Sequence, residues 1–262
     1  GAFADGSDAV SQYWVSTEQY GEAVTGLFRA SSEFSMLQPE MQRQLANTNS
    51  ILMTYGVGAD TLASAFQNTT KIMGQTAAQA NQTLLEMSAL ATDLGVPIDQ
   101  MMNDFDNMMP QLAALGPTAG ASFREMARVA KITGLEMNKL LNLTSKFDTF
   151  EGAAESTGAL NAALGGNFVN AMDMMMTTDP VERFEMLRGA LDDAGLSFDE
   201  MSYYQRQFFA EQMGLESVGD LALMMSGDMS ALSDEVGQTS AEYEAQAQAA
   251  AEAASVQAKF QG

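Results

Sequence analysis

The sequence predicts an all-α protein built from consecutive short helices, and three observations support this fold class. Apolar residues recur at steps of three or four, as they do on one face of a helix. No stretch shows the sustained alternation, rich in Val, Ile and Thr, that is typical of strands. Helical patterns stop repeatedly at a glycine that is followed by Val or Leu. These turns are Gly56-Val57, Gly95-Val96, Gly134-Leu135, Gly195-Leu196 and Gly214-Leu215.

Each of these glycines is predicted to end a helix. Glycine adopts the left-handed conformation without steric cost, and the apolar residue after it can pack back on the last helical turn. The first three turns are 39 residues apart, and Gly74, Gly116 and Gly152 extend the series at steps of 18 to 21 residues. One step fits one short helix, and two steps fit a helical hairpin. A true repeat and the general use of glycine at helix ends both explain this spacing, and both a compact bundle and an extended array fit it.

Composition divides the chain into three predicted segments. Residues 1–35 are rich in Gly, Ala, Ser and acidic residues, and we expect them to be weakly helical. Residues 36–225 contain the helical array. Residues 226–262 shift toward Ala, Gln and Glu, which favour helix but bury little apolar surface. We therefore expect a longer C-terminal helix that is exposed or coils with partner chains.

Helix starts and buried faces are also predicted within the array. Asp179 is expected to cap a helix with Pro180 at its first position, and Ser197–Glu200 has the form of a capping box. Pro97 cannot continue a helix, which strengthens the prediction that the preceding helix ends at Gly95. The segment Gly158–Thr178 has a single charge and is predicted to be a buried or interface helix. The predicted buried faces are Met87, Leu90, Ala91 and Leu94; Val181, Phe184, Leu187, Leu191 and Ala194; and Met201, Tyr204 and Phe208.

Charge and residue types argue against several classes of function. The net charge of −22 disfavours tight binding to nucleic-acid phosphates. Arg124, Arg128 and Lys131 share a helical face, which we interpret as solvated rather than as a surface for an acidic partner. The chain has no cysteine and no histidine, which removes disulfides, thiolate chemistry, His-dependent nucleophiles and ordinary zinc sites. Carboxylate chemistry, Ser/Lys chemistry and oxygen-ligated metals remain open.

The remaining candidate motifs indicate no specific chemistry. The acidic pairs Asp104/Asp106 and Asp192/Asp193 lack the spacing of a calcium loop and are interpreted as solvated faces. Gly165-Gly166 has neither a preceding strand nor a following Lys-Ser/Thr, so it is not a phosphate loop. The 21 methionines suit adaptable cores and interfaces better than a copper site without His or Cys. The sequence therefore predicts no catalytic, cofactor-binding or metal-binding residue.

One enzyme hypothesis stays open as an alternative. Glu155-Ser156-Thr157-Gly158-Ala159 is faintly similar to the Glu-Ser signature of lysozyme-like lytic transglycosylases. These enzymes are all-α and need a catalytic Glu but no His. The Gly-Leu-Met-Gln element of that family is missing, and the chain reads Leu164-Gly165-Gly166-Asn167-Phe168 there.

The stretch from Ile51 to Asp228 resembles the helical region of tail tape measure proteins from marine long-tailed bacteriophages. The Gly-Leu/Val turns carry the resemblance, and the Ala/Gln/Glu-rich tail is similar to the coiled segments of those proteins. Three further segments contribute to it: Phe147-Asp148-Thr149-Phe150-Glu151-Gly152-Ala153-Ala154, Leu164-Gly165-Gly166-Asn167-Phe168 and Asp179-Pro180-Val181-Glu182-Arg183-Phe184.

The resemblance implies a non-catalytic virion protein of the phage tail, made in the bacterial cytoplasm. Several copies would occupy the lumen of the tail tube, set tail length during assembly, and leave ahead of the DNA. It implies contacts with tail tube proteins, baseplate hub proteins and assembly chaperones, self-association, no specific nucleic-acid binding, and membrane contact only at infection. Such proteins are usually much longer than this chain, which does not begin with Met, so we expect a segment of one or a short relative. The alternative is a non-viral helical scaffold or adaptor that binds partner proteins through Met-rich surfaces.

Overall fold

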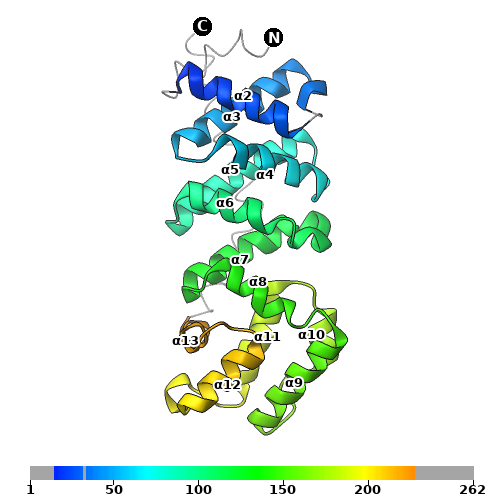
Figure 1. The fold of residues 1–262 in the computed structure, drawn as a ribbon, viewed down its shortest axis with the longest axis vertical. Coiled ribbons are helices and arrows are strands. Elements are labelled where there is room, and N and C mark those ends of the chain that lie inside the picture. The colour runs from blue at the N-terminus through cyan, green and yellow to red at the C-terminus, as the bar shows by residue number, and fades with distance from the viewer. Residues whose placement is uncertain (1–14, 32–33, 228–262) are drawn as a thin grey trace. The chain divides into compact units, whose positions relative to one another are not determined.

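The computed structural model describes residues 15–31 and 34–227, and all regular elements of these residues are helical (Figure 1). The all-α fold class predicted from the sequence is therefore confirmed. The described residues belong to two compact units, divided between Gly120 and Ala121. The boundaries near residues 35 and 225, predicted from composition, stay a prediction.

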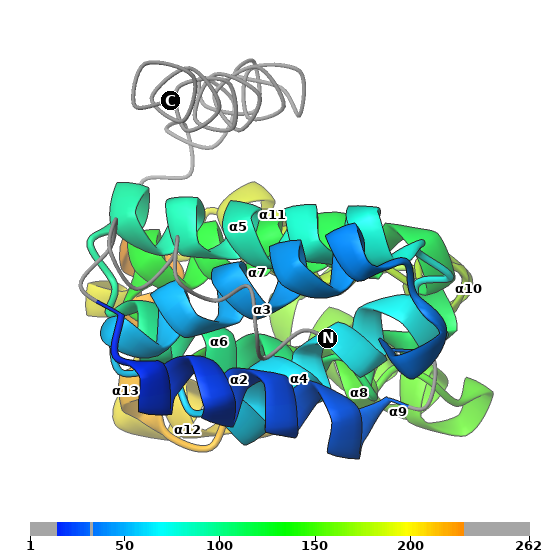
Figure 2. The ribbon, with the colours of Figure 1, turned by 90° about the horizontal axis from the view of Figure 1, so that it is seen from above.

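Unit 1, within residues 15–120, is a stack of short helices joined by short connections. Neighbours in sequence pack together, as α4 does on α5, and alternate helices also pack, as α2 does on α4 and α4 does on α6 (Figure 2). The helix α3 likewise packs on α5. This pattern is that of successive helical hairpins. The elements are α2 Thr17–Ala30, η1 Phe34–Met36, α3 Pro39–Thr54, α4 Ala59–Lys71, α5 Ala77–Leu94, α6 Ile98–Met108 and η2 Leu112–Thr118.

Unit 2 is described for residues 121–227 and contains shorter helices. Its helices pack in the pairs α8 with α11, α9 with α10, α9 with α12, and α12 with α13. Fully buried Phe123, Phe147, Phe184 and Phe209 supply much of the apolar area that this unit removes from water. The elements are α7 Ala119–Thr133 (which begins in unit 1), α8 Met137–Ser145, α9 Phe150–Leu164, α10 Ala171–Met176, α11 Pro180–Asp193, η3 Phe198–Glu200, α12 Tyr203–Met213 and α13 Val218–Ser226.

All five glycine turns predicted from the sequence are confirmed as left-handed helix ends. At Gly95, where φ is 61°, the glycine N–H donates to the carbonyl of Thr92 and the Val96 N–H donates to that of Ala91. This pair of bonds defines the Schellman motif. The turns at Gly56, Gly195 and Gly214 make equivalent pairs of bonds. Gly134 makes the single bond of the simpler left-handed cap, to the carbonyl of Ala130.

The extension of the glycine series to Gly152 is wrong. Gly74 and Gly116 have positive φ, but Gly152 lies in the first turn of α9, where its N–H donates to the Thr149 side chain. The reason for glycine there is a close approach: a Cβ would lie 2.5 Å from the carbonyl oxygen of Lys146. The glycine that ends α9 is instead Gly165, with φ of 76°.

One predicted helix start is confirmed and one is wrong. Asp179 caps α11 by accepting from the N–H groups of Val181 and Glu182, with Pro180 at the first position. Ser197 makes no side-chain capping bond and precedes only the short turn η3. The capping box is formed five residues later, where Ser202 and Gln205 bond reciprocally at the start of α12.

The shifted start of α12 changes its buried face. Because the helix begins at Tyr203, Phe209, Ala210 and Met213 are buried, whereas Tyr204 is exposed. The predicted face of Met201, Tyr204 and Phe208 is therefore wrong, although Met201 itself is buried in the connection before α12. The faces predicted for residues 87–94 and 181–194 are confirmed except for their last residues, Leu94 and Ala194, which are half-buried.

Two further predicted segments differ from the structure or lie outside it. The range Gly158–Thr178 is not one buried helix, because α9 ends at Gly165 and the separate helix α10 follows after a loop. Of the N-terminal segment expected to be weakly helical, residues 17–30 form α2, whose capping box joins Ser16 and Gln19. The predicted C-terminal helix lies outside the described residues beyond position 227.

Candidate functional site: the polar anchors of unit 2

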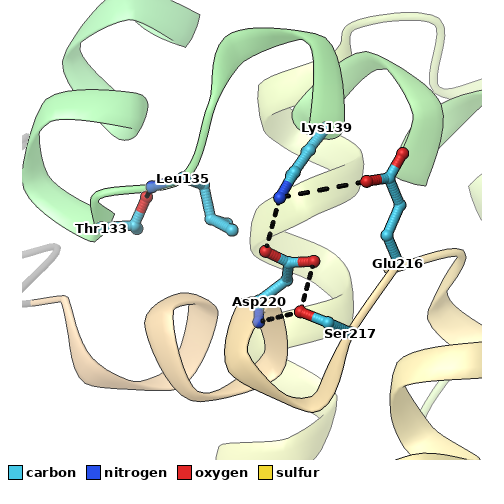
Figure 3. Close-up of polar contacts among 6 residues, drawn as sticks. All are labelled: Thr133, Leu135, Lys139, Glu216, Ser217 and Asp220. Carbon is cyan, nitrogen blue, oxygen red and sulfur yellow. Dashed lines mark hydrogen bonds and ion pairs between the residues drawn. The ribbon is translucent and has the colours of Figure 1, made fainter.

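An ion pair between a half-buried lysine and a buried aspartate joins α8 to α13 in unit 2 (Figure 3). Lys139 Nζ donates to Asp220 Oδ1 at 3.0 Å, although the two residues lie 81 positions apart. Asp220 has only 6% of its side chain exposed, so its charge depends on this partner. Its other oxygen accepts from the Ser217 hydroxyl at 2.8 Å, and Ser217 caps α13 in return by accepting from the Asp220 N–H.

The two charges hold each other in their ionised forms. Burial alone would raise the pKa of Asp220, but hydrogen bonds from Lys139 and Ser217, with the charge of Lys139, place that pKa below its ordinary value. The hydrogen bond to Asp220 raises the pKa of Lys139, and the more distant carboxylate of Glu216, 3.9 Å away, adds to this. Lys139 is therefore protonated at neutral pH and cannot serve there as a base or nucleophile. The pair anchors α13.

The turn before α8 is fixed by a second small polar contact. Thr133, buried at the end of α7, donates its hydroxyl to the carbonyl of Val129 and accepts from the N–H of Leu135. Leu135 is itself buried, so the apolar residue of this Gly-Leu turn enters the core of unit 2 (Figure 3). The contact orients the chain as it enters α8, the helix that carries Lys139.

A second anchor is centred on Arg183 of α11. Its guanidinium Nε donates to the carbonyl oxygens of Met174 and Thr177, at 2.9 and 2.5 Å. Its Nη1 donates to Asp148 Oδ1 at 2.5 Å. Arg183 has 5% of its side chain exposed, whereas Asp148 has 60%. One buried cation thus ties the end of α10 and the loop before α9 to α11.

A third anchor fixes the loop between α9 and α10. The side-chain oxygen of Asn161 accepts from the N–H groups of Phe168 and Val169, both at 2.9 Å, and its amide nitrogen donates to the Val169 carbonyl at 2.7 Å. Asn170 then caps α10 by accepting from the N–H of Met172. These bonds replace the backbone pairing that a loop lacks.

The three segments that carry the family resemblance supply these last two anchors. Asp148 and Thr149 come from the first segment, the loop held by Asn161 includes the second, and Asp179 and Arg183 belong to the third. In the structure, all three segments therefore contain residues that hold the ends of helices in place. None of these contacts aligns a nucleophile with a base.

Residues considered for chemistry lie in ordinary surface or structural positions. Glu155 is exposed on α9, and Asp192 and Asp193 are exposed at the end of α11. Asp106 accepts from the amide of Asn68 at 2.8 Å, so it links α6 to α4. The interpretation of the α7 cations as solvated is wrong for Arg128, which is buried.

Two carboxyl groups between α7 and α11 have raised pKa values. Burial raises the pKa of Glu125, Asp179 and Glu185 raise it further, and Arg128 opposes them. Burial also raises the pKa of Glu185, with repulsion from Glu182 and Asp179. Within residues 15–31 and 34–227, no group of three or more acidic side chains is arranged to hold a metal ion. No helix in the same ranges has the length and hydropathy to cross a membrane.

The long-range anchors carry no signal in the sequence alone. The partners are 81 positions apart in Lys139–Asp220 and 35 positions apart in Arg183–Asp148. Neither pair lies in a recognisable sequence motif. Comparison of the chain with protein-family models, with curated proteins and with solved structures gave no match.

Proposed function

We propose that the chain is a structural virion protein, a segment of a phage tail tape measure protein that occupies the tail tube lumen and sets tail length. The observation that carries the proposal is the succession of short helices, several of them ended by a left-handed glycine, in which α2 packs on α4 and α4 packs on α6. Such a chain can pass from a stack to a line of helices by changing its turns while its helices persist.

Charge and covalent structure support the same proposal. The net charge of −22 would keep the chain from adhering to DNA that passes through the same tube. No cysteine is present, so no disulfide would oppose extension. The core uses many methionines, including Met87, Met101 and Met126, whose flexible side chains repack at low cost.

The proposal includes the partners and place expected from the resemblance. The chain would be made in the bacterial cytoplasm, kept soluble by assembly chaperones, and packed in several copies within the tube. It would contact tail tube and baseplate hub proteins in the virion. It would reach a membrane only when the tail delivers DNA.

The decisive experiment measures tail length in a phage that carries the gene. Deleting one 39-residue period, residues 57–95, in frame removes the helices α4 and α5. If the chain lies as extended helix along the tube, the tail shortens by about 60 Å at 1.5 Å per residue. Electron micrographs of purified virions give the length directly. Tails of unchanged length, in virions that contain the shortened chain, would refute the length-setting role.

One observation favours the scaffold or adaptor alternative. Met172 and Met176 are 49% and 72% exposed, as adaptable contact residues would be. Mass spectrometry of purified virions separates the two hypotheses, because a tail protein is present at a fixed copy number per particle and a host adaptor is absent.

The lytic transglycosylase alternative has less support. A catalytic acid of that class needs a site that excludes water and raises its pKa. Glu155 is instead exposed on the surface of α9, between exposed Ala154 and buried Ser156. Incubation with peptidoglycan tests the alternative: release of soluble fragments that is lost in Glu155→Gln would establish it.

A further inference from the structure

We infer that the surface of the α9–α10 hairpin is a docking site for a basic amphipathic helix of a partner protein. This α9–α10 surface is defined by the exposed apolar side chains Phe150, Phe168, Met172 and Met176. The inference goes beyond the tail proposal and does not depend on it, because it is drawn from the side chains of this hairpin and its loop alone.

Exposed large apolar side chains are concentrated on this hairpin. The described residues hold ten such side chains, and four of them lie within the 27 residues from 150 to 176. Phe150 is 65% exposed, and Met176 is 72% exposed. The two helices pack against each other (Figure 1). The four exposed side chains are therefore carried by one hairpin of unit 2 and its loop. Exposed apolar groups gathered in this way mark interaction sites on soluble proteins.

The fold holds this surface in place with polar bonds rather than by burying it. A helix of six residues has no stability of its own, and α10 buries only Met174 fully. Asn161 and Asn170 fix its start, and Arg183 fixes its end by binding the carbonyls of Met174 and Thr177. The exposed pair of α10 is therefore presented on a fixed backbone, which lowers the entropy lost on binding.

The geometry of the exposed residues suits a helical partner. Met172 and Met176 are four residues apart on α10 and thus share one face. On α9, Ala154 is exposed and Gly158 has open space where a Cβ would be, so a partner backbone can approach closely. Methionine side chains adapt their shape to the apolar face of a helix laid against them.

Charge determines which helix fits. The segment from Phe150 to Met176 contains no Lys or Arg, and its three acidic residues, Glu151, Glu155 and Asp173, are all exposed. An apolar surface with an acidic border attracts a helix that has an apolar face and basic flanks. A second copy of this chain is disfavoured as the occupant, because each copy has a net charge of −22.

The test uses the full chain and a fluorescent 20-residue peptide of Leu and Lys arranged as an amphipathic helix, followed by anisotropy at 0.15 M salt. Binding should weaken roughly tenfold in Met172→Gln/Met176→Gln, as when an apolar anchor is removed. The control Met36→Gln/Tyr55→Gln changes two exposed apolar residues in unit 1, which are 84% and 59% exposed, and should bind like the original chain. Equal loss in both variants would overturn the inference.

A second pair of variants tests the charge requirement. Neutralising the acidic border should weaken binding and flatten its salt dependence, in the variant Glu151→Gln/Glu155→Gln/Asp173→Asn. The control removes the same charge elsewhere, in Asp193→Asn/Asp199→Asn/Glu200→Gln, and should have a smaller effect. Equal effects, or equal binding of a peptide with the same composition but no amphipathic order, would show attraction to net charge only and would overturn the inference.

A spectroscopic readout identifies the surface directly. With methyl-labelled methionine, addition of the peptide should shift the signals of Met172 and Met176 and leave that of Met36 unchanged. Shifts confined to other methionines would overturn the inference even if the peptide binds. Tail length in phage is unaffected by any of these outcomes, so failure here is distinguishable from failure of the tail proposal.

Discussion

Arg183 donates to Asp148 across 35 positions of the chain, while the same guanidinium binds the carbonyls of Met174 and Thr177. The two partners of this ion pair differ in exposure, since Arg183 is buried and Asp148 has 60% of its side chain in solvent. Loss of the cation therefore removes a donor from two carbonyl groups, whereas loss of the carboxylate leaves a cation that still donates to both of them.

This asymmetry predicts unequal effects of two substitutions. Arg183→Leu should lower the free energy of unfolding by about 1–3 kcal/mol for each buried carbonyl oxygen that it leaves without this donor. Asp148→Asn should cost less, because the asparagine oxygen can still accept from Nη1 of Arg183 and the two carbonyl bonds to its Nε remain. Urea unfolding of the full chain measures both. Equal losses would show that the exposed carboxylate, not the carbonyls, is the important partner.

The Lys139–Asp220 pair predicts a dependence of stability on pH. The pKa of Asp220 is lowered in the folded state, so its contribution is present above its ordinary value of 3.8 and is lost as pH falls through the folded pKa. The pKa of Lys139 is raised, so its contribution is present below 10.5 and is lost as pH rises beyond that value. Asp220→Asn should therefore destabilise the chain by roughly 1.5–3 kcal/mol at neutral pH.

Unfolding curves of the original chain and Asp220→Asn at several pH values check this prediction. The difference between them should be constant from about pH 5 to 9 and shrink below the ordinary pKa of the carboxyl group. A difference that persists unchanged at pH 2 would mean that packing, not charge, explains the loss.

A left-handed glycine and a helical glycine predict opposite effects of the same substitution. Gly95→Ala should cost about 1–2 kcal/mol, because φ there is 61° and a Cβ is strained in that conformation. Gly189→Ala should stabilise α11 by about 0.5–1 kcal/mol, because that glycine is inside a helix and its Cβ would enter open space. Thermal unfolding of the two variants gives both signs, and stabilisation by Gly95→Ala would contradict the assigned turn.

Asn49 of α3 predicts a stabilising substitution. The residue is fully buried, and within the described ranges neither its amide nitrogen nor its amide oxygen has a hydrogen-bond partner. Burial of an unpaired amide costs about 1–3 kcal/mol, so Asn49→Leu should raise the free energy of unfolding by a similar amount. Urea titration measures the change. The exposed Asn138→Leu is the control and should have little effect, and destabilisation by Asn49→Leu would indicate a bound water at that site.

The fold class and the turns could be predicted from the sequence because they depend on neighbouring residues. A glycine followed by Val or Leu determines its own left-handed cap within six residues, as the Schellman bonds at Gly95 show. Asp179 and Pro180 similarly specify the start of α11 without help from distant segments. Such local preferences are independent of how the helices later pack.

The start of α12 shows where local patterns compete. Ser197 and Ser202 are each followed, three positions later, by a residue that can complete a capping box. The structure uses Ser202, while Arg206 binds the carbonyl of Phe198 and lies 4.2 Å from the centre of its ring. This contact joins η3 to α12. The two residues are eight positions apart, so a search for capping motifs does not include the contact.

The anchors could not be predicted, because their partners are far apart in sequence. Nothing near Lys139 indicates that it meets Asp220, and a basic residue on a helix is more often solvated. Arg128 illustrates the same limit, since its helical spacing with Arg124 and Lys131 indicated a solvated face but the residue is buried. Tertiary packing decides whether a charge is buried, and the spacing of residues along the sequence gives no information about that packing.

The use of methionine in the core and on the α9–α10 surface has a consequence for oxidation. Because the chain has no cysteine, methionine is its only sulfur-containing residue, and peroxide converts it to the polar sulfoxide. Met36, Met172 and Met176 should react first because they are exposed, whereas Met174, between the last two, is fully buried and should react only when α10 detaches. Peptide mass spectrometry of a timed oxidation would thus record, helix by helix, the order in which the molecule opens.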